Sequence, residues 1–258
     1  MTNIRAKGFS LVEAMLSTAI IAVIIALMFN MSSSLFSVMS AQGSKQDETK
    51  KFINVYNNLN RTLSMSAPYY FYSYYNEGKR EDYRWFFYPC PTDSDGICQA
   101  SNDRPYWMKV YFWFLRRPDG DKCQPEIIHD GMRCPHKKLV RLCYDYTGSQ
   151  ENSYFCEALN QFCEHCDVLM TNPVPAEKIS LEINGEKADG LFVLSENKTI
   201  AENILDLETS DGTHGKTINF SLTTIKLAEA EKKIRIGDMD LTKSKYAEKE
   251  TWAITPAN

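Results

Sequence analysis

The sequence predicts an α+β fold, in which a long N-terminal α-helix packs on an antiparallel β-sheet globular domain with a cysteine-rich insertion. An apolar run near the N-terminus continues, with no proline before Pro68, into a segment whose apolar residues recur at helical spacing. Aromatic-rich runs and short alternating segments follow, and both are typical of strands. All eight cysteines fall between Cys90 and Cys166, which marks the insertion.

The first element is an apolar segment, Phe9–Met31, in which Glu13 is the only charged residue. As a helix it would be about 34 Å long, enough to cross a bilayer core of ~30 Å. Arg5 and Lys7 precede it, and no basic residue follows before Lys45. The positive-inside rule therefore leaves the N-terminus in the cytoplasm and places the rest of the chain outside.

Glu13 helps to distinguish between the possible functions of the N-terminal segment. A secretory signal would have a shorter apolar core and a small-x-small cleavage site, for which Ser40–Ala41 is a poor match. A plain membrane anchor fits the length, but it gives Glu13 no role, and a carboxylate in an apolar helix normally has a partner.

Residues 8–13, with the sequence GFSLVE, resemble the type IV prepilin signature: a short basic leader, a glycine, an aromatic residue, and a glutamate at the fifth mature position. The resemblance implies that a prepilin peptidase cuts between Gly8 and Phe9 and that Phe9 becomes the methylated N-terminus. It also implies that Glu13 pairs with the Phe9 ammonium of a neighbouring subunit and sets the register of assembly. We prefer this interpretation because leader, glycine, aromatic residue, glutamate and apolar run coincide.

The apolar segment continues into an amphipathic one. Beyond Lys45, apolar residues recur mostly at spacings of three and four: Phe52, Val55, Tyr56, Leu59, Leu63 and Met65. We expect one helix from about Ser10 to Ser66, apolar all round in its first half and lying with one face on a globular domain in its second. Two helices with a hinge near Gly43 are the alternative.

Three aromatic-rich runs come next, at Tyr69–Tyr75, Tyr83–Tyr88 and Trp107–Leu115. We interpret them as strands whose faces stack on a helix. The alternative is an exposed aromatic surface that binds sugars or partner proteins.

The cysteines predict a disulfide framework, because an even number of them is clustered in a domain that we expect to be exported. The candidates are Cys90, Cys98, Cys123, Cys134, Cys143, Cys156, Cys163 and Cys166. Each disulfide would stabilise the domain by about 2–4 kcal/mol. The sequence does not choose among the possible pairings.

Cys163–Cys166, with the sequence CEHC, is the one place with metal-like spacing. With Cys156, Cys134 or His136 it would form a tetrahedral zinc site. A thioredoxin-like dithiol would need a surrounding βαβ pattern, which the sequence lacks. We expect structural disulfides here and no metal.

The sequence contains no catalytic motif. The four histidines lack HExxH spacing, and neither a P-loop, a GxSxG elbow nor a GxGxxG fingerprint occurs. The acidic turns Asp93–Gly96 and Asp119–Asp121 do not continue into a twelve-residue calcium loop closed by glutamate. The net charge is −4 and no Lys/Arg-rich cluster occurs, so we expect no nucleic-acid partner, no cofactor and no enzymatic activity.

The last third of the chain changes to short β segments, at Lys178–Asn184, Gly190–Leu194 and Ile218–Ile225. The segment Thr199–Glu208, followed by Thr217–Thr224, resembles the closing strands of longer minor pilins and of the J-type pseudopilin. In those proteins, as in this chain from Ala201, an Ala-Glu-Asn-aliphatic sequence precedes an alternating strand. We expect Glu229–Glu250 to form a solvated surface helix and tail.

The chain therefore divides into a leader (1–8), a long helix (9–66, of which 9–31 is transmembrane), an aromatic- and cysteine-rich part (67–175) and C-terminal β segments with a charged tail (176–258). The resemblance implies a minor pilin or pseudopilin of a type IV pilus or type II secretion filament. Its partners would be other pilins or pseudopilins, the prepilin peptidase and the inner membrane. The protein would cross that membrane once, with its domain in the periplasm, before entering a pilus or pseudopilus. The alternative function is an adhesin-like binding module at a pilus tip.

Overall fold

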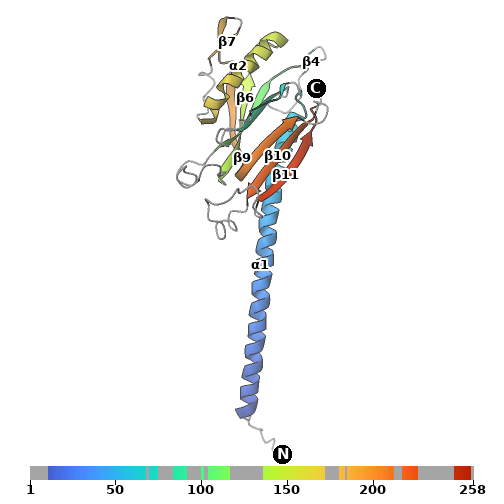
Figure 1. Ribbon diagram of the computed structural model, residues 1–258, viewed down its shortest axis with the longest axis vertical. Coiled ribbons are helices and arrows are strands. Elements are labelled where there is room, and N and C mark those ends of the chain that lie inside the picture. Colours follow the sequence, from blue (N-terminus) through green and yellow to red (C-terminus); the bar gives the residue numbers. More distant parts are fainter. Residues whose placement is uncertain are drawn as a thin grey trace, which may run out of the picture. The chain divides into compact units, whose positions relative to one another are not determined.

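The computed structural model describes residues 11–67, 70–74, 84–91, 100–101, 104–116, 136–171, 180–183, 185–211, 217–225 and 247–256 (Figure 1). The chain forms two compact units, Met1–Thr49 and Lys50–Asn258. Helix α1, Leu11–Leu63, is one continuous helix that includes Gly43. The prediction of a single long helix is confirmed, and the alternative with a break near Gly43 is wrong.

The second unit is built on a seven-stranded antiparallel sheet with the strand order β1-β2-β5-β6-β9-β10-β11. Two small sheets, β3-β4 and β7-β8, accompany it. The elements are β1 (Tyr72–Tyr74), β2 (Trp85–Cys90), β3 (Ala100–Ser101), β4 (Arg104–Pro105), β5 (Lys109–Arg116), β6 (Lys137–Tyr146), α2 (Asn152–Thr171), β7 (Ser180–Ile183), β8 (Glu186–Asp189), β9 (Phe192–Asp211), β10 (Ile218–Ile225) and β11 (Ala247–Ile254). The predicted α+β class is thus confirmed, whereas much of the predicted cysteine-rich insertion lies outside the described residues.

The central strands are buried on both faces, which explains their aromatic runs. In β2, Trp85 and Phe87 point into one core, and Phe86 and Tyr88 point into the other. Successive side chains of a strand alternate between faces, so a sheet covered on both sides needs apolar residues at every position. The interpretation of these runs as packed sheet faces is confirmed.

Helix α2 covers one face of the sheet. Phe155, Leu159, Phe162 and Cys166 are fully buried there, at spacings of three and four that place them on one side of the helix. The ring of Phe162 meets Phe87 edge-on, with the centroids 5.2 Å apart. This helix was not predicted from the sequence.

The second half of α1 covers the other face. From Lys50 onward, Phe52, Val55, Leu59 and Leu63 are buried in the core formed with the sheet. This apolar stripe is the one that the spacing predicts. Burying four such side chains contributes roughly 6–12 kcal/mol relative to leaving them exposed.

A row of polar residues runs beside the apolar stripe of α1 and binds it to three strands. Asn54 donates to the carbonyl of Ile200 in β9 at 2.8 Å, and Arg141 of β6 donates to the Asn58 side-chain oxygen at 3.0 Å. Thr62 shares a 2.6 Å hydrogen bond with the hydroxyl of Tyr88 in β2. Polar contacts at intervals of four residues therefore fix the rotation of α1 on the sheet.

Strand β9 changes its partner halfway along its length. Its first half pairs with β6 as far as Ile204, and its second half pairs with β10 from Ile204 onward. Asn203, at this junction, has a φ of 60° and adds a residue to β9 opposite Lys137 and Lys138. Such a bulge bends a strand, and asparagine tolerates the left-handed conformation better than most residues.

The C-terminal prediction requires a correction. Residues 247–250, expected to belong to a solvated helix and tail, are part of strand β11. Trp252 of this strand packs on α1, with its ring centroid 6.0 Å from that of Phe52. Residues 226–246 lie outside the described part of the chain. The edge strand was missed because the consecutive charged residues at 248–250 concealed the apolar side chains of Trp252 and Ile254 that follow them.

Candidate assembly helix

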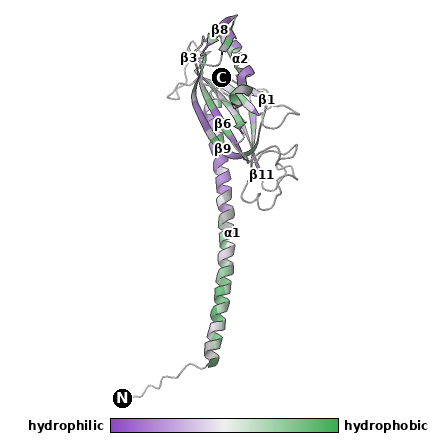
Figure 2. Ribbon diagram, turned by 90° about the vertical axis from the view of Figure 1, so that its left-hand side faces the viewer, coloured by the Kyte–Doolittle hydropathy of each residue, from purple (hydrophilic) through white to green (hydrophobic). Residues whose placement is uncertain are grey.

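The part of α1 from Leu11 to Thr49 exposes apolar side chains on all sides. Within it, Met15–Phe36 is long and apolar enough to cross a membrane, and none of it is buried inside the protein. Figure 2 colours most of this part of α1 as hydrophobic. A helix that is apolar all round needs lipid or other protein around it, because water alone does not accommodate such a surface.

Two hydroxyl groups of this segment are satisfied within the helix itself. Thr18 donates to the carbonyl of Met15 at 2.9 Å, and Ser33 donates to the carbonyl of Asn30 at 3.0 Å. In a bilayer every polar group must find a partner inside the protein, and hydroxyls bonded to the preceding helical turn meet that requirement. Thr18 and Ser33 are therefore compatible with a lipid environment.

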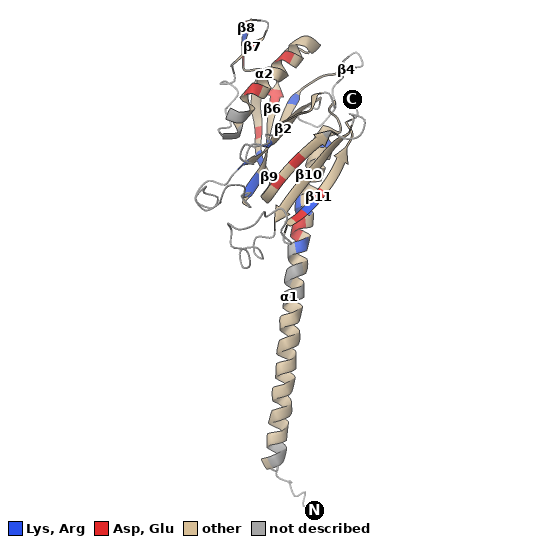
Figure 3. Ribbon diagram, viewed as in Figure 1, with Lys and Arg blue, Asp and Glu red and all other residues tan. Residues whose placement is uncertain are grey.

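Charge is confined to the two ends of this segment. Between Glu13 and Lys45 the sequence has no charged residue, and the charges of Lys45, Asp47 and Glu48 follow within one turn (Figure 3). As a helix the neutral stretch is about 46 Å long, which exceeds a membrane core of ~30 Å, so it can cross the core and extend into a headgroup region before the charged turn.

The structure describes only part of the predicted processing and assembly site. Gly8 and Phe9 lie outside the described residues. Glu13 lies in α1, as the third described residue of the helix, but its side chain is outside the described part of the structure. The roles of these three residues remain predictions.

The predicted disulfide framework is described only in part. Cys90 and Cys143 are buried on the α1 face of the sheet and Cys166 beneath α2, and no disulfide joins any two of the five described cysteines. Cys156 and Cys163, half-buried on α2, are two turns apart, and about 10 Å of helical rise exceeds the ~7 Å that a disulfide spans. The remaining candidates, Cys98, Cys123 and Cys134, lie outside the described residues.

The zinc alternative finds no ligand set in the described part of the chain. No three His, Cys, Asp or Glu side chains there are grouped closely enough to hold a metal ion. Nδ1 of His165 lies 2.9 Å from the carbonyl of Gln161, and the thiol of Cys166 is fully buried near the Phe162 carbonyl. The helix thus directs Cys163 and Cys166 to different environments.

Sequence reasoning missed the polar row of α1, Asn54, Asn58 and Thr62, because it considered only the apolar stripe. The signal was present: the three residues are spaced by four, which places them in one line on a helix. Arg141, which binds Asn58, also contacts both carboxylate oxygens of Glu196 at 2.9 and 2.6 Å. The row is therefore extended by a partly buried ion pair.

Comparison with known proteins identifies the N-terminus. Residues 3–29 match the family described as the prokaryotic N-terminal methylation motif. The chain thus has a prepilin-type N-terminus and is type IV pilin-like, in agreement with the sequence prediction, and its apolar helix fits a membrane-anchored pilin. No curated protein and no solved structure matches the chain.

Proposed function

We propose that the protein is a minor pilin or pseudopilin, cut between Gly8 and Phe9 and built into a type IV pilus or type II secretion filament through α1. One coincidence carries the proposal: the methylation motif at residues 3–29 overlaps a helix whose apolar side chains are exposed on every side. A motif of this kind accounts for such a helix, because the same surface serves lipid before assembly and neighbouring subunits after it.

Processing changes the electrostatics of the N-terminus. Cleavage removes Arg5 and Lys7 with the leader and leaves the Phe9 ammonium near the start of α1. This ammonium group stays charged when it is methylated. In a staggered bundle of helices, the Glu13 carboxylate of one subunit reaches the Phe9 ammonium of its neighbour. Opposite charges ~4 Å apart at an effective dielectric of ~20 attract by roughly 4 kcal/mol before desolvation is subtracted.

The location of the protein follows from the same segment. Arg5 and Lys7 hold the leader in the cytoplasm, α1 crosses the inner membrane once, and the second unit lies in the periplasm. Residues 50–258 form a large domain, which would crowd every position of a tightly packed shaft. We therefore favour a low-copy or tip subunit over the main repeating subunit.

Processing is tested by intact mass and N-terminal sequencing of the protein isolated from membranes. The expected product begins at methylated Phe9. A start at Ala41 or Gln42 would identify a secretory signal instead, and an unprocessed chain that never enters filaments would identify a plain anchor. Gly8→Ala should be processed poorly, and Gly8→Phe should not be cut.

A second candidate function is a binding module at the tip of such a filament. Most of the described side chains of the aromatic runs are buried in the two cores, although Tyr74, Trp85 and Phe86 also line a cavity. The observation in its favour is a cavity in the second unit with a largely polar wall. The two functions are compatible in one molecule.

A further inference from the structure

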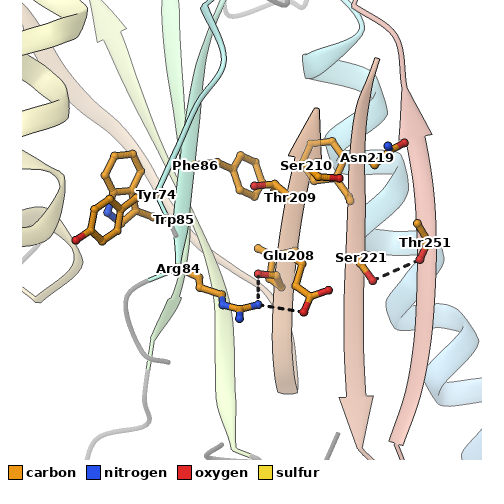
Figure 4. Close-up of a pocket in the computed structure, with 12 residues that line it drawn as sticks. Tyr74, Arg84, Trp85, Phe86, Glu208, Thr209, Ser210, Asn219, Ser221 and Thr251 are labelled. Carbon is orange, nitrogen blue, oxygen red and sulfur yellow. Dashed lines mark hydrogen bonds and ion pairs between the residues drawn. The ribbon is translucent and has the colours of Figure 1, made fainter. Parts of the chain in front are cut away.

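A cavity of about 330 Å³ opens on the main sheet of the second unit (Figure 4). Residues of β1 and β2, with Arg84 just before β2, form one wall, and residues of β9, β10 and β11 form the other. Its volume is at the lower end of the ~300–1,000 Å³ typical of small-molecule sites. The cavity therefore suits one small ligand or one unit of a longer polymer.

The charges beside the cavity neutralise one another. Arg84 is almost fully buried, and its Nη1 lies 2.5 Å from Oδ1 of Asp206 and 3.6 Å from Oε1 of Glu208. The same nitrogen donates to the carbonyl of Leu207 at 3.3 Å. Lys249 donates to the other oxygen of Glu208 at 2.8 Å. Among the described residues two cations face two carboxylates, so an ionic ligand would meet no excess of opposite charge from them.

The wall formed by β9–β11 presents hydroxyl and amide groups in two rows. The strand register places Ser221 opposite Glu208 on one side and Thr251 on the other, and it places Asn219 opposite Ser210. Neighbouring strands are about 4.8 Å apart, so each row offers donors and acceptors at that spacing. The Ser221 and Thr251 hydroxyls also lie 3.4 Å apart.

The opposite side of the cavity is aromatic. Tyr74 and Trp85 line it as a stacked pair, with their ring centroids 5.5 Å apart and their planes 10° from parallel. Phe86 and Phe220, with ring centroids 5.2 Å apart, also line the cavity. The cavity thus combines an apolar side with a side of neutral hydrogen-bonding groups.

We propose that this cavity binds a neutral carbohydrate, as a single hexose-sized unit of a glycan. A sugar carries C–H groups on its ring faces and hydroxyls around its rim, which match the aromatic and polar walls. A wholly apolar ligand would cover the Asn219 amide without bonding it, at a cost of about 1–3 kcal/mol, and would offer the Ser221 and Thr251 hydroxyls nothing beyond their mutual 3.4 Å contact. This inference does not depend on assembly of the protein into a filament.

The test is saturation-transfer NMR with the full-length protein and a panel of methyl glycosides of neutral hexoses, with sialic acid and glucosamine as charged comparisons. The protein is kept in a phosphocholine detergent, because maltoside and glucoside detergents would occupy a sugar site themselves. We expect at least one neutral glycoside to bind and to be preferred over both charged sugars. Failure of every neutral glycoside to bind, or a preference for a charged sugar, would overturn the proposal.

Two variants place the binding in the cavity. Ser210→Phe fills the cavity from an exposed strand position and should abolish binding, whereas Thr251→Val removes one hydroxyl and should weaken it about three- to tenfold. The matched control is Thr255→Val, because Thr255 forms a similar 3.1 Å hydroxyl pair with Thr217 but does not line the cavity. Thr255→Val should bind like the natural protein. Unchanged binding by Ser210→Phe, with its circular dichroism intact, would refute the site.

Discussion

Replacing Arg84 by methionine would remove a buried guanidinium from two carboxylates while keeping most of the side-chain volume. Asp206 is the partner most affected, because its side chain is only 2% exposed and lies 2.5 Å from Nη1 of Arg84. The Leu207 amide donates to Asp206 at 2.9 Å and stays in place. A neutral hydrogen bond of this kind does not replace the neutralising charge.

The expected loss follows from the burial of both groups. Breaking a buried ion pair by removing one partner costs about 3–5 kcal/mol, because the remaining charge is left in a poorly solvated site. Replacing both partners, as in Arg84→Met/Asp206→Leu, removes that charge too. The double variant should therefore be less destabilised than the sum of the single variants by at least ~2 kcal/mol.

Urea unfolding followed by tryptophan fluorescence measures these differences. All four tryptophans, Trp85, Trp107, Trp113 and Trp252, belong to the second unit, so the signal reports its unfolding and not that of the apolar part of α1. Lys187→Met is the matched control, because the Lys187–Asp189 pair is exposed and should contribute less than ~1 kcal/mol. The predicted effect of the buried ion pair would be refuted if Arg84→Met and Asp206→Leu each lowered the free energy of unfolding only slightly. It would also be refuted if the loss in the double variant equalled the sum of the two single losses.

The remaining predictions concern the bulge, the assembly carboxylate and a buried thiol. Asn203→Val should destabilise the second unit by about 1–3 kcal/mol, because a β-branched residue resists a φ of 60°, whereas Asn203→Gly should stay within ~1 kcal/mol; equal losses in urea unfolding would contradict this. Glu13→Leu and Glu13→Gln should keep membrane insertion and processing but lower the ratio of filament-associated to membrane-associated protein; a natural ratio for both would exclude Glu13 from assembly. Burial raises the pKa of the Cys143 thiol, so at pH 8 less thiolate forms than in the unfolded chain. Iodoacetamide should label Cys143 slowly until urea is added, and its rate in the folded protein should keep rising above the pH at which the rate in the unfolded protein levels off.

The helix α1 and the central strands were predictable because each has one strong signal. The apolar run and its amphipathic continuation extend over the whole of Leu11–Leu63 without proline, and the aromatic runs of β2 and β5 are longer than any surface strand requires. The prepilin motif was predictable for a different reason, because a peptidase reads it directly in the chain.

Helix α2 was missed although its pattern is helical. Phe155, Leu159 and Phe162 are spaced by four and three, but the cysteines between and after them were interpreted as disulfide or metal ligands before their periodicity was considered. The sugar-binding cavity lay beyond sequence reasoning altogether. Arg84 and Glu208 are more than a hundred residues apart in the sequence, and the fold brings their charged groups to within 3.6 Å of each other.

The hydrogen bond between Asn54 and Ile200 has a consequence for the order of synthesis, because 146 residues separate its two ends. A ribosome adds about 5–20 residues per second, so the apolar stripe of α1 waits roughly 7–30 s for the strand that helps to cover it. During that interval the nascent chain presents Phe52, Val55 and Leu59 without the neighbours that β9, β10 and β11 supply. Chains stalled before β9 should therefore be degraded or held by chaperones, whereas chains stalled after β11 should resist protease. Because α1 and β9 are far apart in the sequence, we expect this domain to fold slowly and only after β9 has been synthesised.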